Sequence, residues 1–423
     1  MLRNSLNNIL FYLLAMLMCF PILHMKVSNF LIVIFALFSL ASAIYYRKEN
    51  TWVGYKELLI YIGPFVLILL SVLLRETNQE AKFYLEKSLS LLIIPISFFL
   101  SPLKLSENQK TRLFSLFAIS SLLITTWGIF RSFSRLHVFL ENGLVKSYKE
   151  LTSHPAFSHY LRTYFEDATS IHPTYASIFL GISFLIFFYR LITSFTKEKN
   201  KFVSFYILGC ILSLVFLSIL ASRAPFAGTI LGASILYAFL IHNRTNFIWF
   251  SAGVVILVLG IYFLVPSFSA RFNEVSTQNM GLPDAESQNS FNIRTGIYKC
   301  SFAIIKDNWL VGVGPGNLQT ELNQCYNKIS KEVYEVRDYN THNQYLDYWA
   351  SMGILAPILL LLLFGWVLIK NFHQKNWLAI AICALFFTTF FTENVLLRQN
   401  GVVIFSLFMS LFGFNLPQSQ KKP

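Results

Sequence analysis

Charged residues are scarce in this sequence, and their scarcity excludes an ordinary soluble protein. They make up 13% of the 423 residues, against about 25% in a typical globular domain. Hydrophobic residues make up 55%, and phenylalanine alone occurs 43 times, as expected for side chains that face lipid. The net charge of +13 does not indicate nucleic acid, because the basic residues lie in short segments between apolar runs. Membrane topology explains that placement better.

Motifs for metal or nucleotide binding are also missing from the two long polar segments, near 132–172 and 267–350. These segments contain no closely spaced Asp-X-Asp pair, no cluster of His and Cys, and no glycine-rich phosphate loop. The acidic pair at 166–167 is weak evidence for a metal. The glycines at 312–316 lack the lysine of a nucleotide-binding loop, so we interpret them as a turn. These absences argue against a nucleotide-sugar enzyme and against an ATPase.

Cysteine is rare as well, with five in the chain. Within apolar runs, where a buried and inert thiol is expected, lie Cys19, Cys210 and Cys383. Cys300 and Cys325 both lie in the segment 267–350. These two would pair in an oxidising compartment if their geometry allowed it, a question that the sequence leaves open.

Twelve apolar runs are long enough to cross a bilayer, whose core needs about 20 apolar residues per helix. The boundary at Ser222-Arg223 is the least distinct, and one long broken helix is the alternative there. We expect an all-α polytopic membrane protein with about 12 transmembrane helices. The runs lie near residues 6–24, 28–46, 57–74, 84–101, 113–131, 173–190, 203–220, 224–241, 246–266, 351–370, 376–392 and 399–415.

The basic residues support this count. If the amino terminus is cytoplasmic, every predicted inner loop is basic, as the positive-inside rule requires. Both termini are then cytoplasmic, and 132–172 and 267–350 become outer loops of a single membrane domain covering residues 1–423. Long loops in an otherwise short-looped bundle usually carry function. The basic residues counted are Arg47, Lys48, Lys56, Lys104, Lys110, Arg112, Arg190, Lys197, Lys199, Lys201, Arg244, Lys370, Lys375, Lys421 and Lys422.

The larger outer loop contains an amphipathic stretch from Phe291 to Ile305, which ends before the glycine-rich turn. An amphipathic helix of this kind lies in the plane of the membrane interface. We therefore expect amphipathic helices in this loop, on the outer membrane surface.

The most specific local feature is the segment Thr341 to Gly353, which leads into the tenth apolar run. His342 lies there at the membrane boundary, within reach of both water and a lipid-borne substrate. An unperturbed imidazole is largely neutral at pH 7 and can accept a proton. The alternative is an interfacial histidine that caps a helix or anchors the chain together with its aromatic neighbours.

Three basic residues are candidates for binding an anion. Arg223 lies on a turn with almost no loop around it, where a charge near hydrocarbon is costly. Its guanidinium matches phosphate oxygens bidentately, although a side chain that merely reaches toward the headgroups is the alternative. Arg294 on the amphipathic stretch is a second candidate, with a solvated surface arginine as its alternative. Lys87 opens the fourth apolar run, where it either attracts phosphate or pairs with Glu86.

These features together resemble the O-antigen ligase and O-antigen polymerase superfamily of bacterial membrane glycosyltransferases. The resemblance covers about residues 172–402. One departure concerns Ala356, because ligases commonly have a small or hydroxyl residue at the equivalent place, three after the glycine; ligase and polymerase therefore both stay open. The resemblance is carried by His172-Pro173-Thr174-Tyr175, Ser222-Arg223, Arg294 with Trp309, Gly312, Gly314 and Gly316, His342-Asn343 with Gly353, and Glu393-Asn394.

The resemblance implies transfer of a glycan from undecaprenyl diphosphate to an acceptor hydroxyl, on lipid A–core for a ligase or on another glycan for a polymerase. Arg223, Arg294 and Lys87 would bind the diphosphate, and His342 would act as the general base of an inverting reaction. Asn343 and Glu393 would support it. The resemblance implies no metal or other cofactor, no nucleic acid partner, and a periplasmic active site in the bacterial inner membrane.

The alternatives from other classes are a secondary transporter and a non-catalytic assembly protein. A secondary transporter predicts two related halves and ionisable residues at mid-span, and the sequence shows neither. A non-catalytic assembly protein leaves the outward convergence of the two arginines and His342 unexplained.

Overall fold

The computed structural model describes residues 2–45, 55–75, 78–101, 103, 105–141, 157–196, 202–241, 244–266, 268–269, 281–283, 289–335 and 338–414. Every regular element in these ranges is a helix, in agreement with the all-α prediction. Much of the basic sequence used to orient the chain, including Arg47, Lys48 and Lys197, lies outside the described residues. The first elements are α1 (Leu2–Met18), η1 (Phe20–Ile22), α2 (Met25–Tyr45), α3 (Tyr55–Leu74), α4 (Gln79–Ser88), α5 (Ser90–Leu100), α6 (Glu107–Glu141), α8 (Phe157–Thr169) and α9 (Pro173–Thr196). They are followed by α10 (Val203–Leu220), α11 (Arg223–Leu240), α12 (Arg244–Leu264), α14 (Ser290–Asn308), α15 (Leu318–Tyr334), α16 (Gln344–Met352), α17 (Leu355–His373), α18 (Trp377–Phe390), η2 (Val395–Leu397) and α19 (Gln399–Phe414).

The apolar helices make this a membrane protein. Each of the twelve predicted runs overlaps a helix, and the fourth run is divided between α4 and α5. Among the described residues, eight candidate spans have the length and hydropathy needed to cross a bilayer when α4 and α5 are counted as one. Another four apolar helices, within α1, α12, α18 and α19, are shorter. That all twelve runs span the membrane therefore stays a prediction.

The centre of the bundle is formed by α9, α18 and α19. Every residue of α19 from Gly401 to Gly413 is buried, and α9 packs against α6, α10, α11 and α18. The most extensive helix contact is between α11 and α18, where a Cβ added at Gly232 would lie 2.9 Å from the Ala381 carbonyl oxygen. Small residues of this kind let two membrane helices approach each other closely.

The predicted boundary at Ser222-Arg223 is a break between two helices. α10 ends at Leu220 because Ala221 takes a left-handed backbone conformation with φ 49°. α11 begins at Arg223. The turn between them therefore places Arg223 at the start of a helix.

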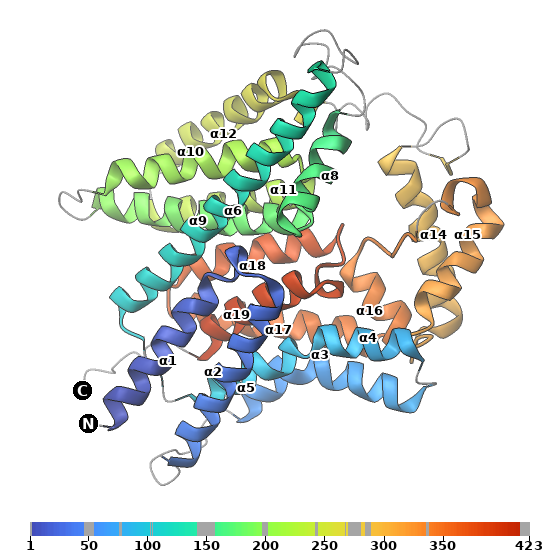
Figure 1. Ribbon diagram of the computed structural model, residues 1–423, viewed down its shortest axis with the longest axis horizontal. Coiled ribbons are helices and arrows are strands. Elements are labelled where there is room, and N and C mark those ends of the chain that lie inside the picture. Colours follow the sequence, from blue (N-terminus) through green and yellow to red (C-terminus); the bar gives the residue numbers. More distant parts are fainter. Residues whose placement is uncertain are drawn as a thin grey trace.

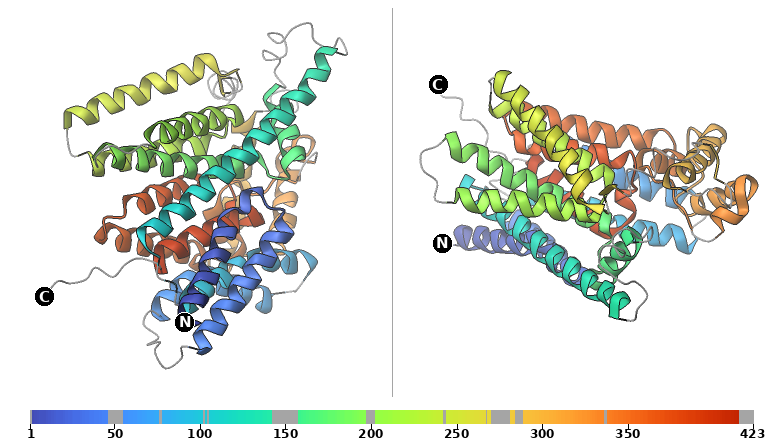
Figure 2. Two further views of the ribbon diagram at one scale, coloured as in Figure 1. Left: turned by 60° about the vertical axis from the view of Figure 1, so that its left-hand side comes forward. Right: turned by 90° about the horizontal axis from the view of Figure 1, so that it is seen from above.

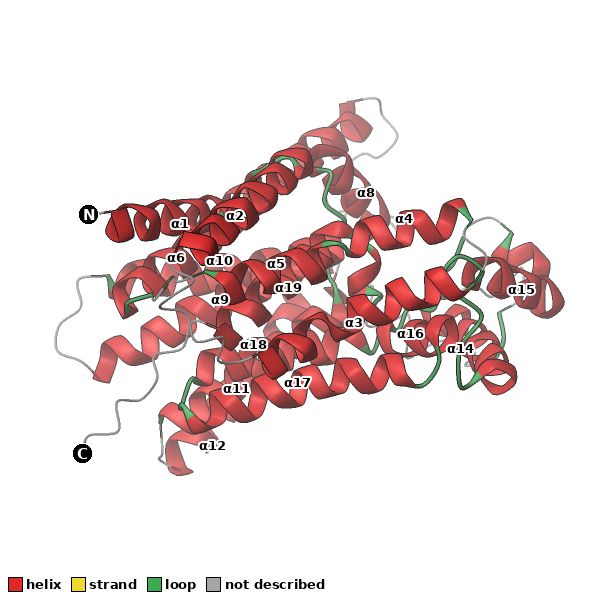
Figure 3. Cartoon of the chain, turned by 90° about the horizontal axis from the view of Figure 1, so that it is seen from below, coloured by secondary structure: helices red, strands yellow, loops and turns green. Residues whose placement is uncertain are grey.

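The bundle has two different ends. α1 begins at the left of Figure 1, whereas α14 and α15 lie at the right and run across the direction of the long apolar helices. The same separation is seen from above in Figure 2 and from below in Figure 3. We call the second of these the α14/α15 end.

The predicted outer loops contain much helical structure. α6 continues to Glu141, and α8 follows within the segment 132–172 and packs against α6. The segment 267–350 contains α14, α15 and most of α16. The stretch predicted to be an amphipathic helix forms α14, which runs across the direction of the long apolar helices in Figure 1; its place on the membrane surface stays a prediction.

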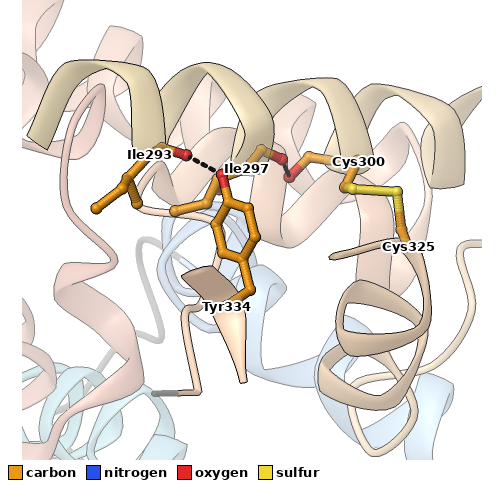
Figure 4. The surroundings of a disulfide bond; sticks show 6 residues. Ile293, Ile297, Cys300, Cys325 and Tyr334 are labelled. Atoms are coloured by element: carbon orange, nitrogen blue, oxygen red, sulfur yellow. Dashed lines mark hydrogen bonds between the residues drawn. A yellow bond between two sulfur atoms is a disulfide. The ribbon is translucent and has the colours of Figure 1, made fainter. Parts of the chain in front are cut away.

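A disulfide between Cys300 and Cys325 joins α14 to α15. It resolves the question that the sequence left open, since the two Cα atoms lie 5.7 Å apart, within the range that a disulfide requires. Figure 4 shows a second link beside it, in which the Tyr334 hydroxyl donates to the Ile293 carbonyl oxygen at 2.8 Å. The pair of helices that carries Arg294 is therefore held by a covalent and a polar contact.

The glycine-rich turn after α14 packs against the end of α16. The amides of Val313 and Gly314 donate to the carbonyls of Ala350 and Ser351, at 2.9 and 2.8 Å. Gly353 ends α16 with φ 81° and ψ 178°, a conformation that is essentially restricted to glycine. A Cβ added there would lie 2.0 Å from the Leu310 carbonyl oxygen. This contact explains why a glycine follows the His342 segment.

Gly353→Ala is expected to destabilise the protein by about 3 kcal/mol, because backbone strain of about 1–3 kcal/mol is added to a clash with the main chain. Thermal unfolding in detergent would show this as a lower midpoint. Gly365→Ala is the matched control, since a Cβ at Gly365 within α17 meets no atom within 4 Å. A midpoint for Gly353→Ala equal to that of the control would contradict the assigned packing.

Candidate active site

His342 lies immediately before α16, at the α14/α15 end. Its backbone is in the left-handed region with φ 45°, which is uncommon for a residue other than glycine and tends to occur at functional sites. The His342 amide donates to Asn340 Oδ1 at 3.0 Å, and the His342 carbonyl accepts from the Tyr298 hydroxyl at 3.4 Å. Hydrogen bonds on both sides thus hold a strained backbone at the one histidine singled out from the sequence.

The segment around His342 is joined to the segment that follows α18. Asn343 caps α16 by accepting from the amides of Tyr345 and Leu346, and its Nδ2 donates to the Phe391 carbonyl at 3.0 Å. The Leu396 amide donates to Gln344 Oε1 at 2.7 Å. Asn343 and Gln344 therefore link the His342 segment to the segment that follows α18.

The buried carboxylate of Asp347 also lies where the His342 segment meets the segment after α18; we call this meeting point the His342 junction. Asp347 is 2% exposed. It accepts from Tyr84 at 3.1 Å, from Thr341 at 3.4 Å and from Asn394 at 2.8 Å. Burial raises the pKa of Asp347 to about 7, against the opposing effect of these three hydrogen bonds. The network connects Thr341, which precedes His342, to Asn394, which follows Glu393.

Glu393 connects His342 to Arg294. Its Oε1 lies 3.3 Å from Arg294 Nη2, and its Oε2 lies 3.8 Å from His342 Nδ1. Burial by itself would raise the pKa of the Glu393 carboxyl, but the imidazole of His342 and the guanidinium of Arg294 lower it to about 2. Glu393 is therefore ionised at neutral pH. Because a carboxylate faces Nδ1, that nitrogen is the one expected to carry the proton of a neutral imidazole.

Three arginines line a cavity beside Glu393, which we call the arginine cavity. Arg162 comes from α8, Arg223 from the start of α11 and Arg294 from α14. The empty volume, including the part open to solvent, is about 340 Å³. The other lining residues are Thr174, Ala221, Ser222, Ser290 and Glu393.

Hydrogen bonds hold the arginines at the wall of this cavity. Arg162 Nη1 donates to the Leu220 carbonyl, and to Ser222 Oγ at 3.1 Å. Arg223 Nη1 donates to Ser290 Oγ at 3.4 Å. With three guanidinium groups and one carboxylate, the lining is positive overall and suits an oxyanion such as phosphate.

Lys87 is not brought together with the arginines. Its ammonium lies 3.6 Å from the ring centre of Phe83. It lines a second cavity, the Lys87 cavity, formed by α4, the start of α15, residues 338–340, Asp347 and residues 396–398. Of the predicted site residues, the structure thus groups Arg223, Arg294, His342, Asn343 and Glu393.

Arg162 and His172 belong to this group but were given no role from the sequence. Arg162 lies in a segment interpreted as a loop, although apolar residues four apart, Phe157, Leu161 and Phe165, indicate a packed helix there and are buried. Burial and the nearby charge of Arg162 lower the pKa of His172 to about 4, so this imidazole is neutral at pH 7. The helical pattern was the signal that could have identified Arg162.

Comparison with known proteins agrees with the resemblance noted above. Residues 208–361 match the family model for O-antigen ligase, a stretch that contains Arg223, Arg294 and His342. No curated protein matches the chain in a direct sequence search. Within the residues that the structure describes, no group of three or more His, Cys, Asp or Glu is arranged to hold a metal ion. Over residues 208–361 the chain is therefore similar to the O-antigen ligase family.

Proposed function

We propose that this protein transfers a glycan from undecaprenyl diphosphate to the hydroxyl of a glycan acceptor, with inversion at the transferred sugar carbon. The observation that carries the proposal is the contact series from Arg294 through Glu393 to His342 at the wall of a cationic cavity. It unites an anion-binding group and a proton acceptor from three distant parts of the chain. The family match supports the same class of reaction.

The diphosphate binds in the arginine cavity. Arg223 and Arg294 line this cavity, and Arg162 adds a third permanent charge. Guanidinium groups remain charged at any relevant pH and bind phosphate oxygens bidentately. Because negative charge grows on the diphosphate as it leaves, fixed cations stabilise the transition state more than the ground state.

His342 is the general base. Its Nε2 accepts the proton of the acceptor hydroxyl while that oxygen forms a bond to the sugar carbon. The bond from this carbon to the diphosphate breaks, and its electron pair remains on the departing phosphate oxygen. A single displacement inverts the configuration of the carbon.

Glu393 supports this step. As an ionised carboxylate near Nδ1, it stabilises the imidazolium that forms when Nε2 takes the proton, as carboxylates do in other base-assisted enzymes. Its second contact, with Arg294, keeps the carboxylate charged and oriented. Fixed cations and this pair would make a metal ion unnecessary.

The membrane setting follows from the donor, because a polyprenyl lipid is confined to the bilayer. We place the protein in the bacterial inner membrane, with the α14/α15 end facing the periplasm and both termini facing the cytoplasm. Lipid A–core is the acceptor if the protein is a ligase. A growing polysaccharide is the acceptor if it is a polymerase.

Reconstitution tests this proposal. Purified protein in liposomes, given an undecaprenyl-diphosphate glycan and either lipid A–core or a second glycan lipid, is expected to form a longer glycan product and to do so in the presence of EDTA. The preferred acceptor distinguishes ligase from polymerase. Absence of product with both acceptors would refute the transferase, and a requirement for added Mg²⁺ would refute the metal-free mechanism.

A further inference from the structure

The Lys87 cavity and the arginine cavity are both bordered by segments that contact His342. The segment after α18 contributes to both, with Glu393 lining the arginine cavity and Leu396 to Arg398 lining the Lys87 cavity. Asn340, whose side chain accepts from the His342 amide, also lines the Lys87 cavity. The segment after α18 therefore borders both cavities, and His342 contacts one lining residue of each, Glu393 and Asn340.

The lining of the Lys87 cavity matches a carbohydrate. Glu80, Gln319, Asp338 and Asn340 offer oxygens and amides that can bond to hydroxyl groups, beside the apolar ring of Phe83. The empty volume, including the part open to solvent, is about 920 Å³. It is considerably larger than the arginine cavity, at about 340 Å³.

Two cations at one side of this cavity indicate an anionic group on that carbohydrate. Lys87 and Arg398 both line it; Lys87 lies on α4 and Arg398 directly follows η2, which packs against α4. An oxyanion placed between two like charges relieves their repulsion. Arg398 also pairs with Glu166 at 3.0 Å. Lys87 is therefore the better residue to replace, because replacing Arg398 would break that pair as well.

We propose that the Lys87 cavity binds the acceptor, and that it recognises an acceptor sugar carrying a phosphate or carboxylate group, which lies against Lys87 and Arg398. The inference rests on the proposed transfer reaction and adds the acceptor's binding site and chemistry to it. An acceptor bound there lies next to Asn340, whose side chain accepts from the His342 amide.

The test measures how Lys87→Ala changes the kinetics of transfer in liposomes. The KM for a phosphorylated lipid A–core acceptor is expected to rise about tenfold, as for loss of a charge-assisted hydrogen bond, with kcat and the KM for the donor unchanged. Lys82→Ala is the matched control, because Lys82 is an exposed lysine on the same helix that does not line the cavity. With an acceptor whose sugars have been dephosphorylated, and which carries no carboxylate, Lys87→Ala and wild type should have equal KM values.

An acceptor that has lost its phosphate but keeps a carboxylate distinguishes between these two groups. If Lys87→Ala still raises the KM for that acceptor, the carboxylate is the group that lies against Lys87. A second measurement needs no variant. Glucose 6-phosphate should inhibit the wild-type enzyme competitively against the acceptor, and more strongly than glucose does. The proposal is overturned if Lys87→Ala changes the KM for the donor instead, or if glucose 6-phosphate competes only with the donor. In either of those cases wild-type transfer would still support the proposed function.

Discussion

Replacing His342 with alanine is expected to lower the rate of glycan transfer by about 10²–10⁴-fold, the usual contribution of a general base. The loss should appear in kcat, because the imidazole acts on the proton during bond formation and contributes little to holding the diphosphate. The measurement is the initial rate of product formation in liposomes at saturating donor and acceptor. Protein yield and thermal unfolding should be close to those of wild type, since the His342 side chain is 28% exposed.

A matched variant separates this chemical role from a general loss of histidine. His373→Ala removes an exposed imidazole in the last turn of α17, remote in sequence from the site, and should retain the wild-type rate. If His342→Ala forms product at that same rate, the assignment of the base is wrong. The left-handed backbone at His342 makes His342→Asn a useful companion, because asparagine tolerates this conformation but cannot act as the base.

Arg223→Ala and Arg294→Ala are each expected to reduce transfer by about 10²–10³-fold, as for removal of a group that stabilises transition-state charge. Lysine at either position should recover part of the rate, since it keeps the charge but loses the bidentate fork. Arg294→Ala should be the more severe, because Arg294 also contacts Glu393. Without that guanidinium the pKa of Glu393 is expected to rise from about 2, so activity in this variant should fall at a higher pH than in wild type as the solution is acidified.

Arg135→Ala is the control for these two arginines. Arg135 forms an exposed pair with Asp167, at 3.1 Å, and does not line the arginine cavity. Exposed pairs contribute about 0–1 kcal/mol to stability, so both rate and stability should be nearly unchanged. Wild-type rates in both Arg223→Ala and Arg294→Ala would show that the arginine cavity does not hold the diphosphate.

The helices were predictable because the hydropathy of a run is a local property. A stretch of apolar residues must satisfy its own backbone hydrogen bonds in lipid, and the helix does this within the segment. For the same reason the break at Ser222-Arg223 could be suspected, although only the left-handed Ala221 decided it. The amphipathic pattern of α14 was likewise readable from the sequence.

The site was predictable only in part. Arg223, Arg294 and His342 attracted attention as polar residues at apolar boundaries, and their convergence was expected from topology and resemblance. Lys87 had the same local signal, yet it lines another cavity, because a boundary position specifies the depth of a residue in the bilayer and not its neighbours. Arg162 was overlooked because its segment was interpreted as a loop.

By itself, the sequence determined that this chain is an all-helical membrane protein, where its apolar helices lie, and that reactive groups gather at their ends. Hydropathy and charge act over a few turns of chain, so no folded partner is needed to infer them. The tertiary structure decided the contact of Glu393 with both His342 and Arg294, the Cys300–Cys325 bond and the division into two cavities. These contacts join residues far apart in the chain, and their geometry depends on how all the helices pack together.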